Sequence, residues 1–242
     1  MEKTLVIIPT YNEKQNIPRL IPAIREHMPG VHIMIVDDHS PDGTADLIKR
    51  LQTRDSDLFL IERSGKLGLG TAYITAFRWA LERDYEYIFE MDADFSHDPA
   101  DLPRLFEECR KGNDLIIGSR YVSGVNVVNW PLNRIFISMG ASFYVRLITG
   151  IPVKDTTAGF VCYRRKVLEK IRLDKIKSKG YGFQIEMKFW TWKNGFKMKE
   201  IPIVFKDRTV GVSKMSGGIF NEALWSVIRI KLNSIFHKKE YI

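Results

Sequence analysis

Two aspartates spaced one residue apart, Asp92 and Asp94, follow the largely apolar run Tyr87–Met91. Such a run before a polar break is typical of a buried strand that ends in a loop. Alternate residues of an extended chain point to the same side, so the two carboxylates could converge. Converging carboxylates repel each other, and a hard cation such as Mg²⁺ or Mn²⁺ relieves the repulsion while it also binds substrate phosphates. The alternative is a solvated turn that caps the next helix, because short Asp-x-Asp motifs are common.

Other polar residues in the first half of the chain also follow apolar runs. They are Glu13, Asp37, Asp38, Lys66 and Arg120. Taken singly, the acidic residues could cap helices, and Lys66 lies in a glycine-rich loop that turn geometry alone could explain. Their shared place at the ends of runs instead predicts one cleft, because ligands of parallel α/β sheets bind at the carboxyl ends of the strands.

The elements that must place these residues alternate between short apolar runs and amphipathic segments. This alternation, with short loops, predicts a single α/β domain with a mostly parallel central sheet flanked by helices. The expected strands are Leu5–Ile8, His32–Val36, Leu58–Ile61, Tyr87–Met91 and Leu115–Gly118. The expected helices are Asn16–His27, Thr44–Gln52, Thr71–Arg83 and Asp98–Lys111.

The chain after residue 120 has longer and less regular elements. A polar loop at Ser123–Asn129 precedes an apolar helix at Leu132–Ile148 that carries two arginines. Neither an internal repeat nor a linker divides the sequence, so we expect one domain spanning residues 1–242. The further expected elements are a strand at Thr156–Tyr163, a helix at Phe183–Trp192, an edge strand at Ile201–Phe205, a loop at Lys206–Gly218 and an amphipathic helix at Ile219–Phe236.

Composition limits the class of protein. Of the 242 residues, 45% are hydrophobic and 27% are charged, as in ordinary globular proteins. Two cysteines, Cys109 and Cys162, argue against a disulfide framework and suit a reducing compartment. The first residues do not have the layout of a signal peptide, and no apolar run reaches the ~18–20 residues that span a bilayer.

The net charge of +8 is unevenly distributed along the chain. Residues 1–150 contain 17 Lys and Arg against 21 Asp and Glu, whereas residues 151–242 contain 20 against 8. A basic C-terminal third favours an anionic partner, such as a nucleic acid, a phosphorylated substrate or an anionic membrane. A nucleic acid is not expected, because the sequence lacks a platform of basic and aromatic residues for bases.

Seven motifs occur in order along the chain. They are Pro9-Thr10-Tyr11-Asn12-Glu13, Val36-Asp37-Asp38-x-Ser40-Pro41-Asp42-Gly43-Thr44, Lys66-x-Gly68-Leu69-Gly70-Thr71-Ala72-Tyr73, Met91-Asp92-Ala93-Asp94-x-Ser96-His97, Gly118-Ser119-Arg120-Tyr121, Asp207-Arg208 and Gly211-x-Ser213-Lys214. This set resembles glycosyltransferase family 2, which has the GT-A, Rossmann-like fold. Within that family the chain is most similar to the polyprenyl-phosphate (dolichyl-phosphate) mannose synthases, from Leu5 to about Leu232, in a short form without their transmembrane helices.

The resemblance implies a single catalytic domain with a donor site for GDP-mannose. Asp94 would bind the divalent metal, Mg²⁺ or Mn²⁺, and Asp92 and Ala93 would contact the donor sugar and phosphate. Arg208 and Lys214 would close over the diphosphate, where positive charge stabilises the leaving group. The other donor-site residues would be Pro9, Tyr11, Glu13, Val36 (through its backbone) and Asp38.

The sequence contains no evident general base, and this bears on the acceptor. A sugar hydroxyl would need a base to remove its proton, whereas the oxygens of a lipid monophosphate are already anionic. Such an acceptor needs cations instead. Arg120 and Arg134 have the donor geometry to bind its phosphate, with Ser138 one helical turn further on. We expect His97 to shape the turn after the two aspartates rather than to act as a base.

We therefore expect an inverting mannosyltransferase that forms polyprenyl-phosphate β-mannose, with Asp92, Asp94 and Arg120 as catalytic residues. Two alternatives remain open: another donor such as UDP-glucose, and a non-catalytic module that binds nucleotide sugar or lipid phosphate. We expect the protein in the cytoplasm, peripheral to the membrane face, attached directly or through a membrane-anchoring subunit. The helices at Leu132–Ile148 and Ile219–Phe236 either lie at that membrane or pack in the core.

Overall fold

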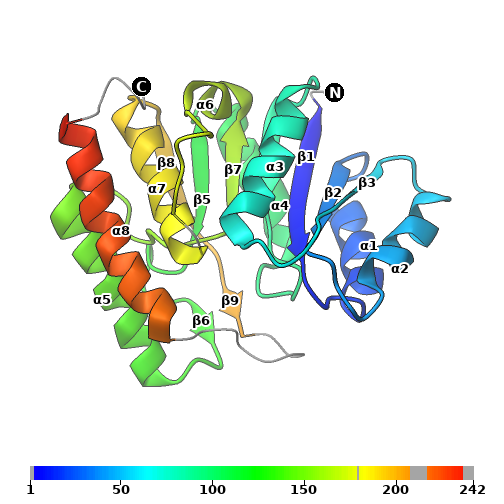
Figure 1. Ribbon diagram of the computed structural model, residues 1–242, viewed down its shortest axis with the longest axis horizontal. Helices are drawn as coiled ribbons and strands as arrows, with labels where there is room; N and C mark the ends of the chain where they lie inside the picture. The colour runs from blue at the N-terminus through cyan, green and yellow to red at the C-terminus, as the bar shows by residue number, and fades with distance from the viewer. Residues whose placement is uncertain (1–2, 179, 208–216, 237–242) are drawn as a thin grey trace.

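The computed structural model describes residues 3–178, 180–207 and 217–236 of the 242. Its centre is a seven-stranded sheet with the spatial order β3-β2-β1-β4-β7-β5-β8 (Figure 1). Neighbouring strands are parallel, except that β7 runs antiparallel to both β4 and β5. The strands of this sheet are β1 (Thr4–Thr10), β2 (His32–Asp37), β3 (Leu58–Glu62), β4 (Tyr87–Glu90), β5 (Leu115–Ser119), β7 (Val161–Arg164) and β8 (Met198–Pro202).

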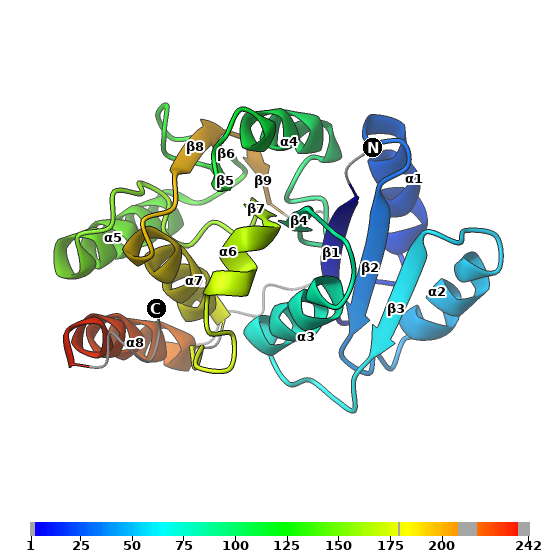
Figure 2. The same cartoon turned by 90° about the horizontal axis from the view of Figure 1, so that it is seen from above.

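Helices cover both faces of the sheet (Figure 2), which confirms the expected α/β fold. Residues of α1, α2 and α4 join the apolar cluster on one face, and residues of α3, α6 and α7 join the cluster on the other. A second sheet pairs β6 (Val127–Val128) with β9 (Phe205–Lys206). The helices are α1 (Ile17–His27), α2 (Thr44–Gln52), α3 (Leu69–Leu81), the 3-10 turn η1 (Pro99–Asp101), α4 (Leu102–Arg110), α5 (Leu132–Thr149), α6 (Arg165–Lys170), α7 (Gly180–Lys193) and α8 (Gly217–Phe236).

The central strand β1 explains why its sequence is a continuous apolar run. Leu5 and Ile7 join the cluster formed with α3 and α7, while Val6 and Ile8 join the cluster formed with α1 and α4. None of these four side chains has exposed surface. Burying one such side chain stabilises the fold by about 1.5–3 kcal/mol. A strand covered on both sides therefore needs apolar residues at every position rather than at alternate ones.

The order of the strands reverses at β1, and this reversal indicates where in the sheet a ligand-binding site is expected. The chain builds β2 and β3 on one side of β1 and then returns to place β4 on its other side. Ligands of such sheets bind at the reversal, outside the carboxyl ends of the strands. After β1, β2 and β4 come Asn12, His39 and Phe95, which have φ angles of 61°, 57° and 61°. Left-handed residues other than glycine are uncommon and gather at functional sites.

Two strands differ from the sequence-based expectation. The strand expected at Ile201–Phe205 is divided: β8 ends at Pro202, on the edge of the main sheet, and β9 follows in the small sheet. The proline is tolerated on this edge strand because its nitrogen faces away from β5, and the next backbone N–H, that of Ile203, still donates to the Ser119 carbonyl over 3.1 Å. The strand expected at Thr156–Tyr163 is also wrong in its first half. Residues 156–160 form a loop, which belongs to the site described below.

Helices α5 and α8 lie side by side at the end of the molecule farthest from β3 and α2 (Figures 1 and 2). Each carries a stripe of large apolar side chains that are 36–73% exposed, and we call the two stripes together the apolar face. The apolar face consists of Leu132, Phe136, Met139, Phe143 and Leu147 on α5, and Trp225, Ile228, Leu232, Ile235 and Phe236 on α8. Of the helices that the structure describes, none combines the length and the apolar character that a membrane span requires.

Gly70 marks a close approach of α3 to α7, and it gives a test of the packing. A Cβ atom here would lie 2.9 Å from two ring atoms of the fully buried Phe183, whereas a Cβ at Gly140 in α5 would meet nothing within 4 Å. We predict that Gly70→Ala lowers the free energy of unfolding by about 1–3 kcal/mol, because the ring cannot move without disturbing the core. Gly140→Ala should raise it by about 0.5–1 kcal/mol through helix propensity. Urea unfolding of the two variants checks this, and a shift in the same direction would contradict it.

Candidate active site

A cavity of about 400 Å³ lies beyond the ends of β4 and β5 and extends between α5, α7 and α8. The residues that line it after the two strands are mostly polar, whereas the helices contribute mostly apolar side chains. Five residues singled out from the sequence line this one cavity: Asp92, Asp94, Arg120, Arg134 and Ser138. Its apolar lining includes Ile137, Tyr144, Val145, Ile185, Leu224 and Val227.

Asp92 and Asp94 lie in the turn that follows β4. The backbone N–H of Ser96 donates to Asp94 Oδ1 over 3.1 Å, and the backbone N–H of Asp92 donates to His97 Nδ1 over 3.1 Å. The side chain of Asp92 is 39% exposed. The turn is therefore fixed by its own hydrogen bonds, while a carboxylate remains within reach of a ligand.

The donor set of this turn suits a hard divalent cation that shares its coordination with a substrate. Within the described part of the chain, no cluster of three or more His, Cys, Asp or Glu side chains could hold a metal ion alone. Mg²⁺ is commonly bound by one or two carboxylates and completes its octahedron with phosphate oxygens and water. Asp92 and Asp94 fit that pattern, and an ion at Asp94 would depend on a phosphorylated ligand for its remaining coordination.

His97 lies beside the two aspartates and is almost fully buried. Its ring stacks on Phe160 at 4.8 Å and meets the edge of Phe205 at 5.6 Å. Burial lowers the pKa of His97 to about 4, so the ring is neutral near pH 7. Because Nδ1 accepts from the Asp92 backbone, the neutral ring carries its proton on Nε2, which lies 3.9 Å from the Asp92 carboxylate. This geometry positions Asp92, and the low pKa does not suit a general base.

A buried polar network supports the strand that carries the two aspartates. Glu90, the last residue of β4, accepts a hydrogen bond from the Gln184 side chain of α7. Lys188 donates to Gln184 Oε1 over 3.1 Å and to the Ala158 carbonyl over 2.6 Å. Burial raises the pKa of Glu90 to about 7 and lowers the pKa of Lys188 to about 8. Sequence reasoning missed this network, which joins β4 and α7 to the loop before β7.

Asp37 and Asp38 end β2 and have different partners. Asp37 is fully buried and accepts from the Thr10 hydroxyl and the Ser40 backbone N–H, each over 2.8 Å, so it joins the ends of β1 and β2. Asp38 forms an ion pair with Arg63, whose Nε lies 2.5 Å from Asp38 Oδ1. Sequence reasoning missed Arg63, although its place directly after β3 is the signal that identified the other residues of this edge.

The remaining donor residues proposed from the sequence surround the ends of β1 and β2. Lys66 Nζ lies 4.7 Å from the centroid of the Tyr11 ring, and the Glu13 carbonyl accepts the first backbone hydrogen bonds of α1. Pro9 and Val36 are partners in the parallel register, and the Val36 side chain is fully buried. Ala93 is buried. These residues and Asp38 lie outside the lining of the cavity, and Arg208 and Lys214 lie outside the described residues.

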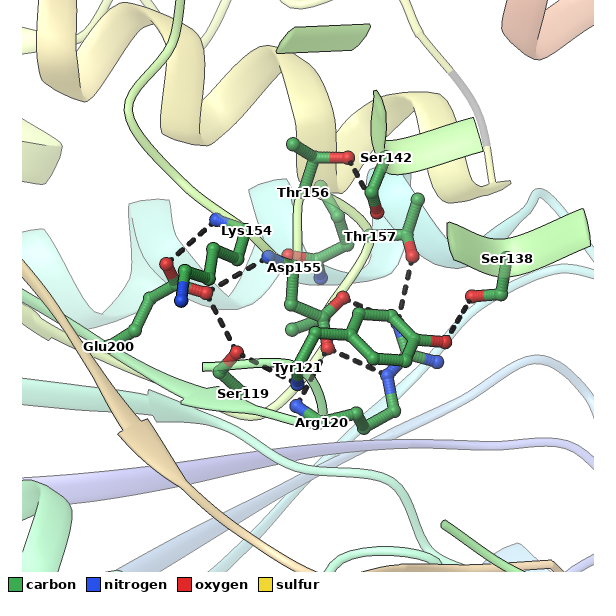
Figure 3. Close-up of polar contacts among 12 residues, drawn as sticks. Ser119, Arg120, Tyr121, Ser138, Ser142, Lys154, Asp155, Thr156, Thr157 and Glu200 are labelled. Carbon is green, nitrogen blue, oxygen red and sulfur yellow. Dashed lines mark hydrogen bonds and ion pairs between the residues drawn. The ribbon is translucent and has the colours of Figure 1, made fainter. Parts of the chain in front are cut away.

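Arg120, directly after β5, is buried and bound to Asp155 (Figure 3). Its Nε and Nη2 donate to the two oxygens of the Asp155 carboxylate over 2.7 and 2.5 Å, and Nη2 also donates to the Thr157 hydroxyl over 2.9 Å. Burial disfavours the charge of Arg120, but the Asp155 carboxylate more than offsets this and raises the pKa of Arg120. Within the described residues Nη1 makes no hydrogen bond, and Arg120 lines the cavity.

Asp155 is itself held by a second carboxylate, that of Glu200 on β8 (Figure 3). The Asp155 backbone N–H donates to Glu200 Oε1 over 2.9 Å, and the Ser119 hydroxyl donates to the same oxygen over 2.7 Å. The Lys154 backbone N–H donates to Glu200 Oε2 over 2.7 Å. Burial would raise the pKa of Asp155, but the charge and hydrogen bonds of Arg120 outweigh it and lower that pKa. Sequence reasoning missed both acidic residues.

Arg134, on the first turn of α5, has a looser environment. Its Nη1 donates to Asp207 Oδ2 over 2.9 Å, and its guanidinium lies 3.9 Å from the centroid of the Trp130 ring. The Arg120 guanidinium lies 5.4 Å from the same ring. One indole therefore lies against both cations, which stabilises two like charges on a single side of the cavity.

Ser138, one turn after Arg134, completes the polar part of the cavity. Its Oγ accepts a hydrogen bond from the Tyr121 hydroxyl over 2.7 Å, so its own proton can point to a ligand. Two cations, one hydroxyl and two aspartates thus border one space. This arrangement can hold an anionic group next to a metal-bound phosphate, as transfer between two phosphorylated molecules requires.

The buried neutral state of His97 predicts a pH dependence of stability. The unfolded chain binds a proton at this residue below about pH 6.5, whereas the folded chain does so only near pH 4. The contribution of His97 to stability is therefore present above pH 6.5 and falls as the pH falls toward 4, by about 1.4 kcal/mol per pH unit and about 3 kcal/mol in all. Glu90, whose pKa is raised to about 7, contributes in the opposite direction over this range, so the His97 loss is measured as the difference between the unaltered protein and His97→Asn in urea unfolding with EDTA at pH 7 and 5. His97→Asn should lose less stability than the unaltered protein between these pH values, and His27→Asn, on the exposed side of α1, should match the unaltered protein; equal pH dependence in all three proteins would refute the assignment.

Comparison with known proteins identifies relatives of this chain. It is 48% identical over 227 residues to the polyprenol monophosphomannose synthase of Mycolicibacterium smegmatis, covering 93% of this chain and 86% of that protein. It is also 48% identical to the undecaprenyl-phosphate mannosyltransferase of Micrococcus luteus, covering 94% of this chain and 93% of that protein.

The fold is similar to that of glucosyl-3-phosphoglycerate synthase from Mycobacterium tuberculosis, solved in complex with Mn²⁺, UDP-glucose and phosphoglyceric acid. The TM-score is 0.69 at 15% identity, over 95% of this chain and 80% of that one. The model of glycosyl transferase family 2 matches residues 5–172. The chain therefore belongs to glycosyltransferase family 2 and is a glycosyltransferase.

Proposed function

We propose that the enzyme transfers mannose from GDP-mannose to a polyprenyl monophosphate, with inversion at the anomeric carbon. One observation carries the proposal: a single cavity joins Asp92 and Asp94 to two arginines and continues between apolar helices. The two aspartates suit a nucleotide diphosphate, and the two arginines suit a phosphate monoester. The apolar lining between the helices suits a lipid chain.

The acceptor half supports a phosphate rather than a sugar hydroxyl. A hydroxyl would need a base poised near neutral pH to remove its proton, and His97, with a pKa of about 4, does not provide one. A phosphate oxygen is already a nucleophile, and it needs positive charge to come close to a second anion. Arg120 Nη1, Arg134 and the Ser138 hydroxyl supply that charge and a further hydrogen bond.

The donor half is assigned to the ends of β1, β2 and β4. Tyr11 offers a flat face to a base, and the second carboxylate oxygen of Asp38 can accept from ring N–H groups or ribose hydroxyls. Asp94 would hold Mg²⁺ or Mn²⁺, with Asp92 and Ala93 against the sugar and phosphates, and the cation would offset charge on the departing diphosphate. Pro9, Glu13, Val36, Arg208 and Lys214 complete the proposed donor site.

The acceptor and donor sides lie on opposite sides of the two aspartates, which favours direct displacement. Arg120 and Arg134 would aim a phosphate oxygen at the anomeric carbon, opposite the bond to the leaving GDP. A single displacement inverts that centre and gives the β-linked product. No proton needs to be removed from the acceptor, which agrees with the neutral, buried ring of His97.

The names of the two 48%-identical relatives support mannose as the sugar and a polyprenyl phosphate as the acceptor. The guanine base of the donor rests on the family resemblance. The chief alternative keeps the reaction and changes the donor to UDP-glucose. A module that only binds its ligands is disfavoured, because the acidic turn and the paired arginines are both intact in one cavity.

A transfer assay tests the donor, the metal and the acceptor site together. The enzyme is incubated with GDP-mannose, UDP-glucose or other sugar nucleotides, Mg²⁺ or Mn²⁺, and a polyprenyl monophosphate, and the lipid-linked sugar is measured. We expect transfer from GDP-mannose, abolished in Asp94→Ala. Arg134→Ala should chiefly raise the KM for the lipid phosphate. Full turnover in either variant would remove the role given to that residue, and no transfer from any donor would favour a binding module.

We infer that the enzyme lies peripherally at the cytoplasmic face of the membrane, and the apolar face supports the contact with lipid. Its ten large side chains lie on α5 and α8, the same helices that line the apolar part of the cavity. An amphipathic helix with such a stripe binds at the boundary between headgroups and acyl chains. Attachment through a membrane subunit would use the same surface, so a test with pure lipid separates the two.

Sedimentation with vesicles of phosphatidylethanolamine and phosphatidylglycerol provides that test. Phe136 and Phe143 are 70% and 65% exposed, so serine at both positions should leave the fold intact. Each phenylalanine contributes about 1.5–3 kcal/mol when buried in lipid, so the double variant should bind vesicles at least about tenfold more weakly. Val125→Ser, at an exposed loop residue, is the control. If the unaltered enzyme does not sediment with the vesicles, attachment through a partner subunit is favoured.

A further inference from the structure

The two arginines of the acceptor site have acidic partners of different kinds, and this inference rests on the proposed function of that site. Asp155 has no exposed surface, whereas the Asp207 side chain is 29% exposed. Asp155 binds Arg120 through both carboxylate oxygens, while Asp207 accepts from Arg134 Nη1 through its Oδ2 atom. The first pair is part of the interior, and the second is accessible to solvent and ligand.

Arg120 cannot exchange its partner when a ligand arrives. Its carboxylate partner is buried and further fixed by the Arg120 backbone N–H, 2.9 Å away, and by the link to Glu200. Separating the pair would leave an uncompensated buried charge, which is strongly destabilising. A ligand can therefore use the Nη1 atom of Arg120 but cannot displace Asp155.

Arg134 can exchange its partner without moving. The central carbon of its guanidinium lies 3.9 Å from the centroid of the Trp130 ring, while its Nη1 donates to Asp207 Oδ2. A planar guanidinium held by its face keeps its edge donors for carboxylate or phosphate. The ring would therefore hold Arg134 in the cavity while one anion replaces another at its edge.

Asp207 is held next to this edge by the small sheet. Its backbone N–H donates to the Val128 carbonyl over 3.1 Å, directly after the pairing of β6 with β9. Two residues beyond Val128 comes Trp130, so the same sheet places the indole and the carboxylate around Arg134. The backbone contact would keep the carboxylate near the cavity if a ligand displaced it from Arg134.

We propose that Asp207 occupies Arg134 as an internal competitor, and that the acceptor phosphate must displace it to bind. The carboxylate carries one negative charge, whereas a phosphomonoester carries about 1.5–2 at pH 7. A phosphomonoester therefore outcompetes the carboxylate, while an uncharged polyprenol or a singly charged phosphodiester has less advantage. Asp207 thereby selects lipids with a terminal monophosphate and favours release once the product has become a phosphodiester.

The test compares Asp207→Asn with a matched variant, Asp55→Asn. The Arg25–Asp55 pair has the same 2.9 Å separation and exposures of 22% and 28%, against 23% and 29% for Arg134–Asp207, and it lies outside the lining of the cavity. Exposed pairs of this kind are weak, so we expect Asp207→Asn to lower the KM for a polyprenyl monophosphate about two- to fivefold. The KM for the sugar nucleotide should be unchanged, and Asp55→Asn should match the unaltered enzyme. An unchanged or raised acceptor KM in a folded Asp207→Asn enzyme would overturn the proposal.

A double variant separates competition from general repulsion of anions. When Arg134 is replaced by Gln, Asp207 and the acceptor phosphate no longer compete for its guanidinium. Adding Asp207→Asn should then leave the acceptor KM unchanged from that of the Arg134→Gln enzyme. If Asp207→Asn lowers KM equally in both backgrounds, the effect is a diffuse charge effect and the proposed displacement is wrong.

Direct binding keeps this proposal distinct from the proposed function. Equilibrium binding of decyl phosphate, without any sugar nucleotide, should be two- to fivefold tighter in Asp207→Asn. If this holds while no donor is used, the transferase assignment fails and the competition stands. If transfer to the lipid proceeds and Asp207→Asn binds decyl phosphate no tighter, the competition alone fails.

Discussion

A charge that is buried inside a protein must be neutralised by a neighbouring group, and the buried charge on which this site depends is the guanidinium of Arg120. Asp155 and Thr157 converge on its guanidinium, and Glu200 fixes Asp155 in turn. The end of β5, the edge strand β8 and the loop before β7 must therefore keep one mutual arrangement, because any departure leaves a buried charge unpaired. The ion pair thereby ties the loop before β7, which contributes Thr157 to the lining of the cavity, to the end of β5.

The sequence predicted those parts of the site that depend on strand ends. In a parallel sheet with one point of reversal, the residues after successive strands meet at one edge, so Asp92, Asp94 and Arg120 could be grouped from their positions alone. Partners across the fold could not be found in this way. Arg63 and Asp155 bind residues that are 25 and 35 positions away, and Asp207 binds one that is 73 away. A single sequence carries periodicity, but it does not say which distant carboxylate a given cation will meet.

The two apolar helices show a second limit of the same kind. The spacing of apolar residues in α5 predicts a helix with an apolar side, and this spacing is the same for a helix in the core and a helix at a membrane. In the structure one side of α5 packs in the core and another side is exposed: Ser142 and Val145 are buried, whereas Phe143 and Leu147 are 65% and 70% exposed. The expected strand at Ile201–Phe205 was wrong for a related reason: the chain passes from the main sheet to the small sheet within this apolar run, and the pattern does not show which sheet a residue joins.

The left-handed residues Asn12, His39 and Phe95 have a consequence for how this enzyme could evolve. Each stores backbone strain at the rim of the site, and glycine at any of them would relieve it. The same change would let the loop sample many more conformations before a substrate binds. At these three positions, selection for stability would favour relief of the strain, whereas selection for turnover would favour the residues that restrict the loop. This is the stability–activity trade-off common to enzymes. Stabilising substitutions would therefore be least compatible with activity at the rim of the active site and most compatible with it in the helices far from the site.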